Sequence, residues 1–497
     1  MTAPFDPHLP AAPPVVAQPR PTKSASKQAP SRSPYARTPE QAAKLASIRA
    51  ERAALWKKIE EAGGIAAWVR AELANKGVST DGLDPSTLSD KQKGAFKEKK
   101  RAEAEARRAL KRLAWAAYKE THISHLGAVH WDDDQSPDKL DIDGREERAK
   151  DNQLADLRTP DDLAKALGLT ISRLRWLTYH RDVDSGTHYR RWQIPKRDGT
   201  LRTITAPRSH MKAAQRWALR NVWDKLPVHG AAHGFLTARS IVTNARAHAG
   251  ADVIVKIDIQ DFFPTITFRR VKGLLRKAGL PEGVSTLLGL LCTEPPRDTL
   301  VHRGKTLYVA SGPRALPQGA PTSPQITNAL CRRMDRRLSG LARMLGMAYT
   351  RYADDLTFSW KQPVSKPEDA ASVPVRAPIG VLLRGSSAIL KAEGFRVHAK
   401  KTRIMRAGTR QAVTGLVVNA ASGAPPARVP RDVVRRLRAA IKNRELGREG
   451  KGPKETLAQL KGLAAFVYMA DPEKGRRFLD RLSALEKAQP ESTDPTS

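Results

Sequence analysis

Alternating apolar and polar positions predict a β-hairpin over residues 349–360. A period of two runs through residues 349–353 and again through 356–360, with a small polar turn between them, which is typical of strand–turn–strand. The turn carries Asp354 and Asp355, two adjacent carboxylates that repel each other. A divalent cation such as Mg²⁺ or Mn²⁺ would offset that repulsion, because both prefer hard oxygen ligands. Taken alone, an Asp-Asp turn is more often an ordinary solvated turn, so a distant partner has to decide between the two interpretations.

A second strand, predicted over residues 252–259, supplies that partner. Its alternate faces carry Val253, Val255, Ile257 and Ile259 on one side, and Ile254, Lys256 and Asp258 on the other. A strand this apolar on both faces is expected inside a sheet. It delivers Asp258 near its end, where a charge requires a partner. A metal ion shared with Asp354 would provide one.

Helical periodicity and turn signals place further elements around these strands. Residues 194–204 predict a hairpin with an Asp-Gly turn, on which Lys196, Arg197 and Arg202 lie close together. These cations either clamp a triphosphate or belong to an ordinary solvated hairpin. Residues 211–223 predict a helix, and a Gly/Pro loop over 316–324 runs into a helix that continues to Leu341, with Thr322 or Ser323 as its cap.

The N-terminal third has a different pattern. Residues 1–45 are rich in Pro, Ala, Ser and basic residues and predict a disordered basic tail. Residues 46–150 predict a helical basic extension followed by a mobile acidic linker, with a domain boundary near 150. The segment 91–112 is dense in Lys, Arg, Glu and Ala, and it is either a basic helix that docks RNA or a partner protein, or a solvated helical face. Two short helices are expected around Gly168.

The C-terminal part predicts a basic helical region. After a Pro/Ala/Ser-rich surface insertion at 361–378, the sheet-containing unit ends near residue 420. An amphipathic helix begins after Pro430, and two more helices complete a unit that ends near residue 488, before a short disordered tail. Four cations crowd the polar side of the first helix: Arg431, Arg435, Arg438 and Lys442.

Charge and cysteine content narrow the class of protein. The 497 residues include 87 Lys plus Arg against 51 Asp plus Glu, a net charge of +36, which points to nucleic acid as the polyanionic partner. An anionic membrane is the competing partner, but no apolar run is long enough to span one and no signal peptide is seen. Cys292 and Cys331 are the only cysteines and lie far apart, which argues against a zinc site or a disulfide scaffold and fits the cytoplasm.

Three motifs in order resemble the palm of a reverse transcriptase. They are Asp258 in a strand, Pro317-Gln318-Gly319 before a helix, and Tyr352-Ala353-Asp354-Asp355 on a hairpin. The resemblance covers about residues 160–480 and implies an α+β, right-hand polymerase fold of fingers, palm and thumb with an antiparallel palm sheet. Three segments are similar to the bacterial retron class in particular: Gln318–Pro324, Asn244–His248 and Val413–Gly415.

The resemblance implies a specific activity and set of partners. Retron enzymes copy part of their own structured non-coding RNA (the msr–msd type), priming from the 2′-hydroxyl of a guanosine in it, and produce a branched RNA–DNA hybrid called msDNA. Many act in anti-phage defence with an effector protein. No RNase H segment is seen in this sequence, so a host RNase H is expected to remove the template.

The resemblance also implies roles for individual residues. Two-metal nucleotidyl transfer with Mg²⁺, or Mn²⁺ in its place, assigns metal binding to Asp258, Asp354, Asp355 and the carbonyl of Ile259. Contacts to the incoming dNTP fall on Lys196, Arg202, Phe263, Gln318, Gly319 and Lys401, with Phe263 as the side chain that excludes a ribose 2′-hydroxyl. The basic helix after Pro430 would track RNA as part of a thumb. His248 is either a packed histidine or part of the site.

Two other hypotheses compete with a retron enzyme. The first is a group II intron-like or another phage-defence reverse transcriptase; about 80 residues follow Asn419, space for a thumb but not for a maturase plus an endonuclease. The second is a non-catalytic RNA-binding protein, against which the intact Asp258, Asp354 and Asp355 argue. An RNA-templated RNA polymerase is disfavoured by Phe263.

Overall fold

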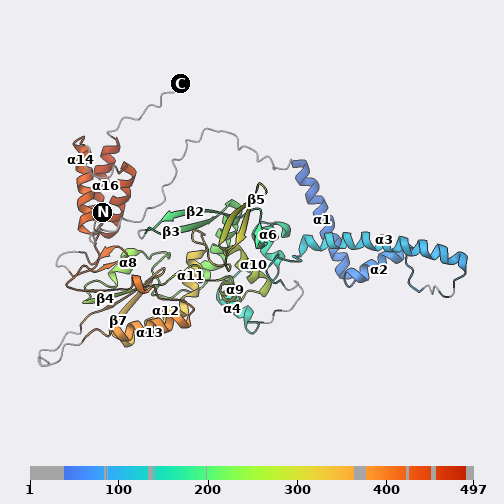
Figure 1. Ribbon diagram of the computed structural model, residues 1–497, viewed down its shortest axis with the longest axis horizontal. Coiled ribbons are helices and arrows are strands. Elements are labelled where there is room, and N and C mark those ends of the chain that lie inside the picture. The colour runs from blue at the N-terminus through green and yellow to red at the C-terminus, as the bar shows by residue number, and fades with distance from the viewer. Residues whose placement is uncertain are drawn as a thin grey trace, which may run out of the picture.

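The computed structural model describes residues 39–82, 86, 88–131, 138, 140–196, 199–362, 376–420, 425–448 and 455–487. Along the chain, these residues form an N-terminal helical unit, a mixed α/β body around a four-stranded sheet, and a C-terminal helical bundle (Figure 1). Several predicted features lie outside the described residues, namely residues 1–38 of the basic tail, residues 132–137 of the acidic linker, Arg197 and Asp198 of the basic hairpin, residues 363–375 of the insertion, and the C-terminal tail.

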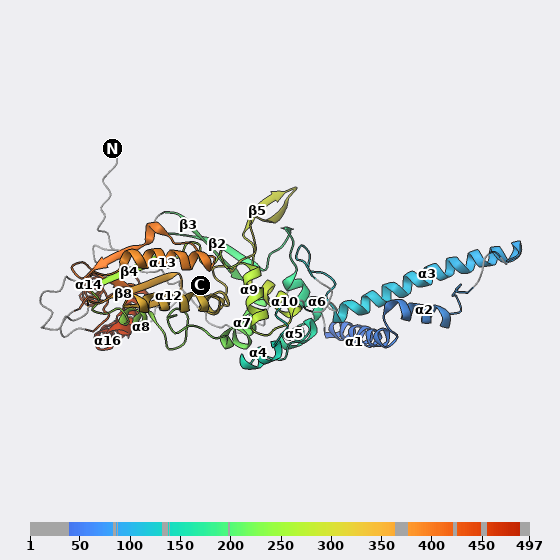
Figure 2. The same cartoon turned by 90° about the horizontal axis from the view of Figure 1, so that it is seen from below.

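The N-terminal helical unit consists of α1 (Pro39–Glu61), α2 (Ile65–Asn75) and α3 (Asp90–Thr121). It has a small core of its own, in which Ile59, Leu73 and Ala114 are fully or almost fully buried. Figure 2 shows α3 projecting away from the body. The predicted disorder up to residue 45 is wrong for residues 39–45, because a proline and an acidic first turn already start a helix there.

The central sheet is antiparallel throughout, in the order β7-β8-β4-β9. Its strands are β4 (Val253–Asp258), β7 (Met347–Tyr352), β8 (Asp355–Trp360) and β9 (Arg403–Arg406). Two helices, α12 (Arg332–Met344) and α13 (Ile379–Ala392), pack together, and α12 contacts β7 (Figure 2). The predicted hairpin and the predicted buried strand are both confirmed.

Shorter helices connect the N-terminal unit to the sheet and surround it. In chain order they are α4 (Arg145–Asp151), α5 (Pro160–Ala166), α6 (Ile171–Thr178), α7 (Ser209–Asn221), the 3-10 turn η2 (Trp223–Lys225), α8 (Ile241–Arg246), α9 (Phe268–Lys277), α10 (Glu282–Cys292), α11 (Ser323–Leu330) and the 3-10 turn η4 (Ala399–Lys401). The two short helices expected around Gly168 are therefore present as α5 and α6. Thr159 caps α5 through a bond from the Asp162 backbone N–H, as a Thr-Pro start predicts.

The remaining strands form small peripheral sheets. The basic hairpin is β2 (Tyr189–Pro195) paired with β3 (Leu201–Pro207), as predicted. A second sheet, in the order β1-β6-β5, joins β1 (Val183–Asp184), β5 (Arg297–His302) and β6 (Lys305–Ala310). A short hairpin of β10 (Ala412–Val413) and β11 (Leu416–Val417) precedes the C-terminal bundle.

The C-terminal bundle contains the three predicted helices, α14 (Arg431–Glu445), α15 (Leu457–Ala470) and α16 (Pro472–Lys487). They share a second hydrophobic core with α8 and the β10–β11 hairpin, in which Leu437, Ile441 and Leu460 are fully buried. The bundle stands at one end of the sheet, opposite the N-terminal helical unit (Figure 1). This arrangement leaves the polar side of α14 exposed.

Three further expectations are corrected by the fold. The acidic segment before residue 150 is no mobile linker where it is described, because Asp141 pairs with Arg276 of α9 (3.3 Å) and Asp138 accepts from the Glu282 backbone N–H (3.1 Å). The helix expected to run to Leu341 breaks at Cys331 into α11 and α12. The Thr322 side chain makes no capping hydrogen bond at the start of α11. The Ser323 hydroxyl does not cap the helix either, because it donates to the Pro317 carbonyl (2.8 Å).

Candidate active site

The hairpin turn between β7 and β8 presents two carboxylates at the end of the sheet. Ala353 adopts a left-handed φ of 58°, which lets the chain reverse within the two residues Ala353 and Asp354. Gly234 lies directly against this turn, since a Cβ on it would stand 3.0 Å from the Ala353 nitrogen. A side chain at this position would press on the Ala353 backbone, so one of the two backbones would have to shift.

Asp258 arrives at the same place from β4. Its Cα is the ladder partner of Asp355, and the next residue, Ile259, donates its N–H to the Asp354 carbonyl (3.0 Å). Burial and then the negative charge of Asp258 raise the pKa of Asp354 above its ordinary value. The structure thus brings Asp258 and Asp354 close enough for their charges to interact, as the sequence predicted.

Two lysines partly neutralise these carboxylates. The Lys401 ammonium donates to Asp258 Oδ1 (3.1 Å), and the Lys256 ammonium lies 2.6 Å from Asp355 Oδ2. Burial raises the pKa of Asp355, and the Lys256 charge opposes that rise. Lys256 is a site residue that sequence reasoning missed, although its place two residues before Asp258 puts both side chains on one face of the strand.

The described side chains supply part of the oxygen shell that a hard divalent ion requires. Within the described ranges, no three His, Cys, Asp or Glu side chains are grouped so that they could hold a metal ion. Asp355, predicted as a ligand, forms an ion pair with Lys256. Asp258 and Asp354 fit Mg²⁺, which commonly takes one or two protein carboxylates and completes its shell with substrate phosphates and water. Ile259, whose carbonyl is predicted as a further ligand, directly follows Asp258 and bonds through its N–H to the Asp354 carbonyl.

A buried ion pair supports the turn from below, and sequence reasoning missed it. Arg351 on β7 and Asp335 on α12 are both 0% exposed, and they form a bidentate pair at 2.8 Å for each outer bond. The Tyr349 hydroxyl also donates to Asp335 (2.8 Å). Arg351 donates further to the Ala353 carbonyl (3.2 Å), one residue before Asp354. Two sequence signals could have predicted this pair: a charged residue on the inward face of a strand, and another on the apolar face of a helix.

The Gly/Pro loop packs against the basic hairpin. The Thr205 N–H of β3 donates to the Gln318 carbonyl (2.7 Å), and Gly319 has a φ of 122°. A Cβ on Gly319 would lie 3.0 Å from Ile204 Cγ2 and 3.1 Å from the Thr205 carbonyl oxygen. The close approach expected of Gly319 is therefore to β3 in this structure. Phe263 is half-buried and packs edge-on against Phe262 at 5.7 Å.

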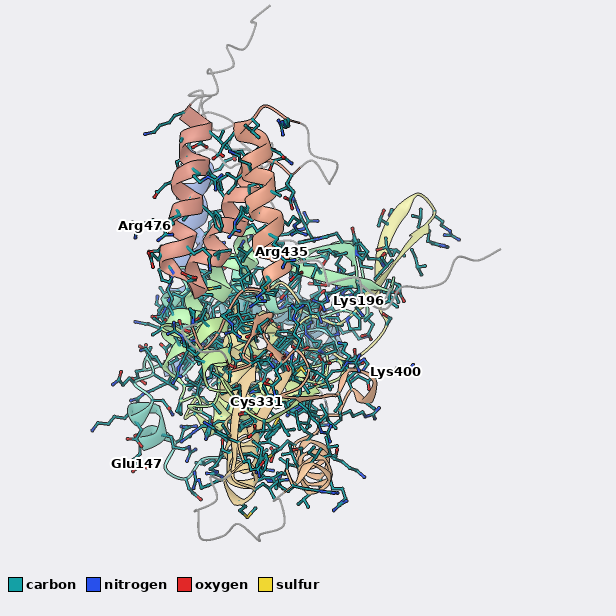
Figure 3. The ribbon with its side chains drawn as sticks, turned by 90° about the vertical axis from the view of Figure 1, so that its left-hand side faces the viewer. Glu147, Lys196, Cys331, Lys400, Arg435 and Arg476 are labelled. Carbon is teal, nitrogen blue, oxygen red and sulfur yellow. The ribbon has the colours of Figure 1, made fainter. Side chains whose placement is uncertain are left out.

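The predicted phosphate-binding and RNA-binding cations are exposed. Lys196 and Arg202 lie near the tip of the β2–β3 hairpin, and Arg431, Arg435, Arg438 and Lys442 lie on the polar side of α14. In the view of Figure 3, Arg435, Lys196 and Lys400 follow one another down one side of the molecule.

His248 is a structural residue. It is 1% exposed, and its two ring nitrogens meet the hydroxyls of Ser359 on β8 and Thr350 on β7, each at 2.7 Å. Burial lowers its pKa to about 3, so the ring is neutral at physiological pH. This contact ties the segment after α8 to the sheet and answers the choice left open by the sequence.

Comparison with known proteins identifies the family. The reverse transcriptase (RNA-dependent DNA polymerase) family matches residues 194–434. The retron Mx162 reverse transcriptase of Myxococcus xanthus is 58% identical over 98% of each chain. The retron Mx65 reverse transcriptase of the same organism is 40% identical over 65% of this chain and 71% of its own, and the retron Ec86 reverse transcriptase of Escherichia coli is 32% identical over 66% and 89%.

No described helix is long and apolar enough to cross a membrane. The family match spans the residues that carry Asp258, Asp354 and Asp355, and the similarity to Mx162 includes the N-terminal helical unit as well. The chain belongs to the retron reverse transcriptase family and is an RNA-directed DNA polymerase.

Proposed function

We propose that this polymerase copies part of its cognate structured non-coding RNA into single-stranded DNA, starting from an RNA 2′-hydroxyl, and so makes branched msDNA in an anti-phage system. The observation that carries the proposal is the meeting of Asp258 and Asp354 at the end of the central sheet, with Ile259 bonded to the Asp354 carbonyl. The central sheet would be the palm, the β2–β3 hairpin part of the fingers, and α14–α16 the thumb.

Two Mg²⁺ ions are the proposed cofactor, with Mn²⁺ as a substitute. Bound ions would stabilise the attacking and leaving oxygens of the transferred phosphoryl group. Asp258, Asp354 and the Ile259 carbonyl are the groups that would hold them. Asp355, paired with Lys256, would support the turn rather than supply a ligand.

The chain's own side chains would position the dNTP. Lys196 and Arg202 reach into solvent from the hairpin and would bind the triphosphate. Lys401, now on Asp258, would move to the β- and γ-phosphates when a nucleotide binds. Gln318 would contact the sugar, and Phe263 would exclude the 2′-hydroxyl by steric contact.

Partners follow from the same proposal. The exposed cations of α14 would track the backbone of the RNA and of the DNA product. An effector protein and a host RNase H are the protein partners proposed. The competing assignment, another phage-defence or intron-like reverse transcriptase, would be favoured if the nucleic acid that co-purifies with the protein contained no branched RNA-linked DNA.

The direct test is replacement of Asp354. In the variant Asp354→Asn, Mg²⁺-dependent dNTP incorporation on poly(rA)/oligo(dT) should fall by at least about a thousandfold, because a metal-binding charge is lost. RNA binding should persist. Asp298→Asn on exposed β5 removes the same charge far from the turn and should leave synthesis unchanged. Unchanged synthesis by Asp354→Asn would refute the site.

Phe263 provides an independent test. Shortening it in Phe263→Val should raise the use of rNTPs relative to dNTPs by about tenfold or more, since the proposed wall against the 2′-hydroxyl becomes lower. Competition between dTTP and rUTP on the same template measures this ratio. A variant with unaltered discrimination would remove Phe263 from the nucleotide site without affecting the metal assignment.

A further inference from the structure

One face of α3 carries regularly spaced cations around an exposed tryptophan. Arg101, Arg108, Arg112, Trp115 and Lys119 follow one another at steps of seven, four, three and four residues. These steps place all five side chains on one side of a helix. All five side chains are exposed, and the exposed fraction of Trp115 is 47%. The row is about 27 Å long at 1.5 Å per residue.

The row continues onto the body of the enzyme. A groove of about 590 Å³ joins Arg112, Trp115 and Lys119 to Ser172 at the start of α6. One turn further along the same face of α6 is Trp176, also 47% exposed. Its ring contacts the Arg173 guanidinium at 3.9 Å and the His188 ring, T-shaped, at 4.2 Å, and Arg173 and Trp176 together form a positively charged platform. We call Arg101, Arg108, Arg112, Trp115, Lys119 and Trp176 the basic strip.

The cations of the basic strip are exposed and available to an external anion. Among the residues that the structure describes, no carboxylate pairs with Arg101, Arg108, Arg112 or Lys119. The one acid in the adjoining groove, Glu120, is already engaged by Arg49 (3.7 Å) and Arg52 (3.0 Å). Over its whole length, α3 has eleven Lys or Arg against five Asp or Glu. Unpaired cations at this density repel one another, and a polyanion would relieve that repulsion.

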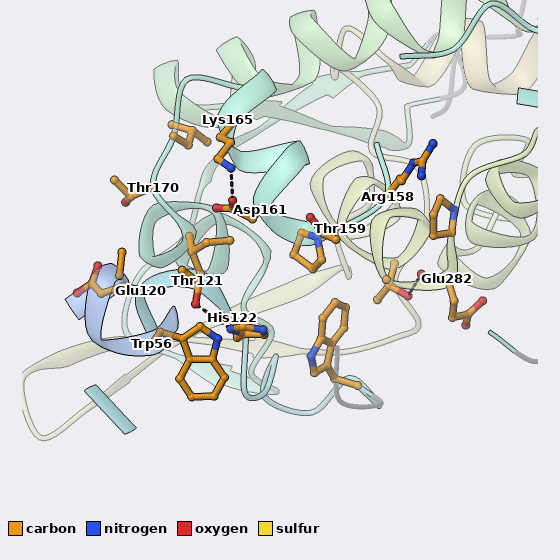
Figure 4. A pocket seen from close by; sticks show the side chains of 18 of the residues that line it. Trp56, Glu120, Thr121, His122, Arg158, Thr159, Asp161, Lys165, Thr170 and Glu282 are labelled. Carbon is orange, nitrogen blue, oxygen red and sulfur yellow. Dashed lines mark hydrogen bonds and ion pairs between the residues drawn. The ribbon is translucent and has the colours of Figure 1, made fainter. Parts of the chain in front are cut away.

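A neighbouring hollow shows the opposite arrangement. It has a volume of about 870 Å³ and lies between α1, the end of α3 and α5 (Figure 4). Five cations and five carboxylates line it. Its charges pair with each other, as in Lys165–Asp161 (2.6 Å) and the Lys272–Glu282 ion pair. The charges of this hollow are balanced, whereas the cations of the basic strip remain available to an external anion.

We propose that the basic strip binds a single-stranded segment of RNA outside the polymerase site, with phosphates on the α3 cations and unpaired bases stacked on Trp115 and on the Arg173–Trp176 platform. The combination of exposed aromatic rings and cations favours single strands, because a duplex hides the faces of its bases. The proposal rests on the proposed function, since it names where the RNA partner of that enzyme is held while another part is copied.

The test uses full-length protein and a fluorescein-labelled 30-nucleotide oligocytidylate. A saturating 20-base-pair rA·dT hybrid occupies the polymerase site during the titration. The triple variant Arg101→Gln, Arg108→Gln, Arg112→Gln should bind about tenfold or more weakly at 0.1 M salt. Its slope of log affinity against log salt should be shallower by about 2, because three phosphate contacts to a single strand are lost at about 0.7 each.

A matched variant controls for the overall loss of charge. Arg332→Gln, Arg336→Gln, Arg343→Gln removes three exposed cations from α12, which lies by the central sheet away from α3 (Figure 2). It should change neither the affinity nor the salt slope. Trp115→Ala should weaken binding about tenfold with an unchanged slope, whereas Trp115→Phe should keep most of the affinity, because a ring remains for stacking.

A second measurement uses the unmodified enzyme, so its result does not depend on whether a variant folds. Oligocytidylate that carries 4-thiouridine should crosslink to peptides of α3 and α6 in the unmodified enzyme with the hybrid bound. Synthesis on poly(rA)/oligo(dT) should be the same in all strip variants. If the parent enzyme made no DNA, the proposed function would be refuted, and the binding measurements alone would then test the basic strip. Unaltered affinity and salt slope in the strip variants, or crosslinks confined to other segments, would overturn the proposal. These are also the results expected if the basic strip binds a protein partner and not RNA.

Discussion

The central sheet and helix α3 both depend on arginine, but they hold it in opposite surroundings. Arg351 is completely buried, with its guanidinium shared among Asp335, Asn328 and the Ala353 carbonyl. Arg112 is exposed and has no carboxylate partner among the described residues. A buried charge is fixed by the partners that compensate its desolvation, whereas an exposed one keeps its freedom and its attraction for external anions.

The difference matches the role proposed for each region. The turn that carries Asp354 must hold its carboxylate within a fraction of an ångström, and a buried network can do that because every member constrains the others. A surface that binds RNA of varied conformation benefits from long, mobile side chains.

The largest expected effect comes from breaking the buried pair. In Asp335→Ala, the Arg351 guanidinium stays buried without its counterion, so the free energy of unfolding should fall by about 3–5 kcal/mol. Thermal or denaturant unfolding of the purified enzyme measures the loss. The exposed Asp298 provides the control, since Asp298→Ala should alter stability by less than about 0.5 kcal/mol. A drop of under 1 kcal/mol in Asp335→Ala would mean that the pair is not buried in solution.

Replacing the whole network separates stability from positioning. The combination Arg351→Met, Asp335→Leu, Tyr349→Phe leaves no unpaired buried charge and should restore most of the stability. DNA synthesis should still be reduced by about a hundredfold, because the Ala353 carbonyl has lost the donor that holds the turn. The measurement is kcat on poly(rA)/oligo(dT). Full activity in this stable variant would show that the network serves folding alone.

His248 extends the comparison to a buried group that titrates. Between pH 6.5 and its lowered folded pKa of about 3, the unfolded chain binds a proton that the folded chain does not. Stability should therefore fall as the pH falls through this window, by about 1.4 kcal/mol per pH unit for one such residue. His248→Gln should flatten the dependence between pH 6 and 5, and His302→Gln on exposed β5 should not. Equal slopes in the two variants would contradict the burial of His248.

The smallest effect on stability is expected for the exposed cations of α3. The triple variant Arg101→Gln, Arg108→Gln, Arg112→Gln should change the melting temperature by about a degree or less, because exposed charges without partners contribute little to folding. A loss of stability comparable with that of Asp335→Ala would show that the basic strip is a structural surface.

Much of the site could be predicted from local patterns. The period-two alternation predicted β4, β7 and β8, and the order of Asp258, Gln318 and Asp354 predicted the family and the activity. The Asp-Gly turn and the Thr159-Pro160 start located the basic hairpin and α5. These features depend on residues close together in the chain, for which backbone preference and hydrophobic periodicity are sufficient.

Long-range contacts decided the rest. The sequence by itself determined that two carboxylates would stand at strand ends in a basic, nucleic-acid-binding chain. Only the tertiary structure decided that Lys256 engages Asp355, that Arg351 and Asp335 meet beneath the turn, and that Gly319 packs on β3. The physical reason is that a charge or a glycine near the surface costs little free energy in many environments. Its actual partner depends on which distant segment the packed core brings beside it.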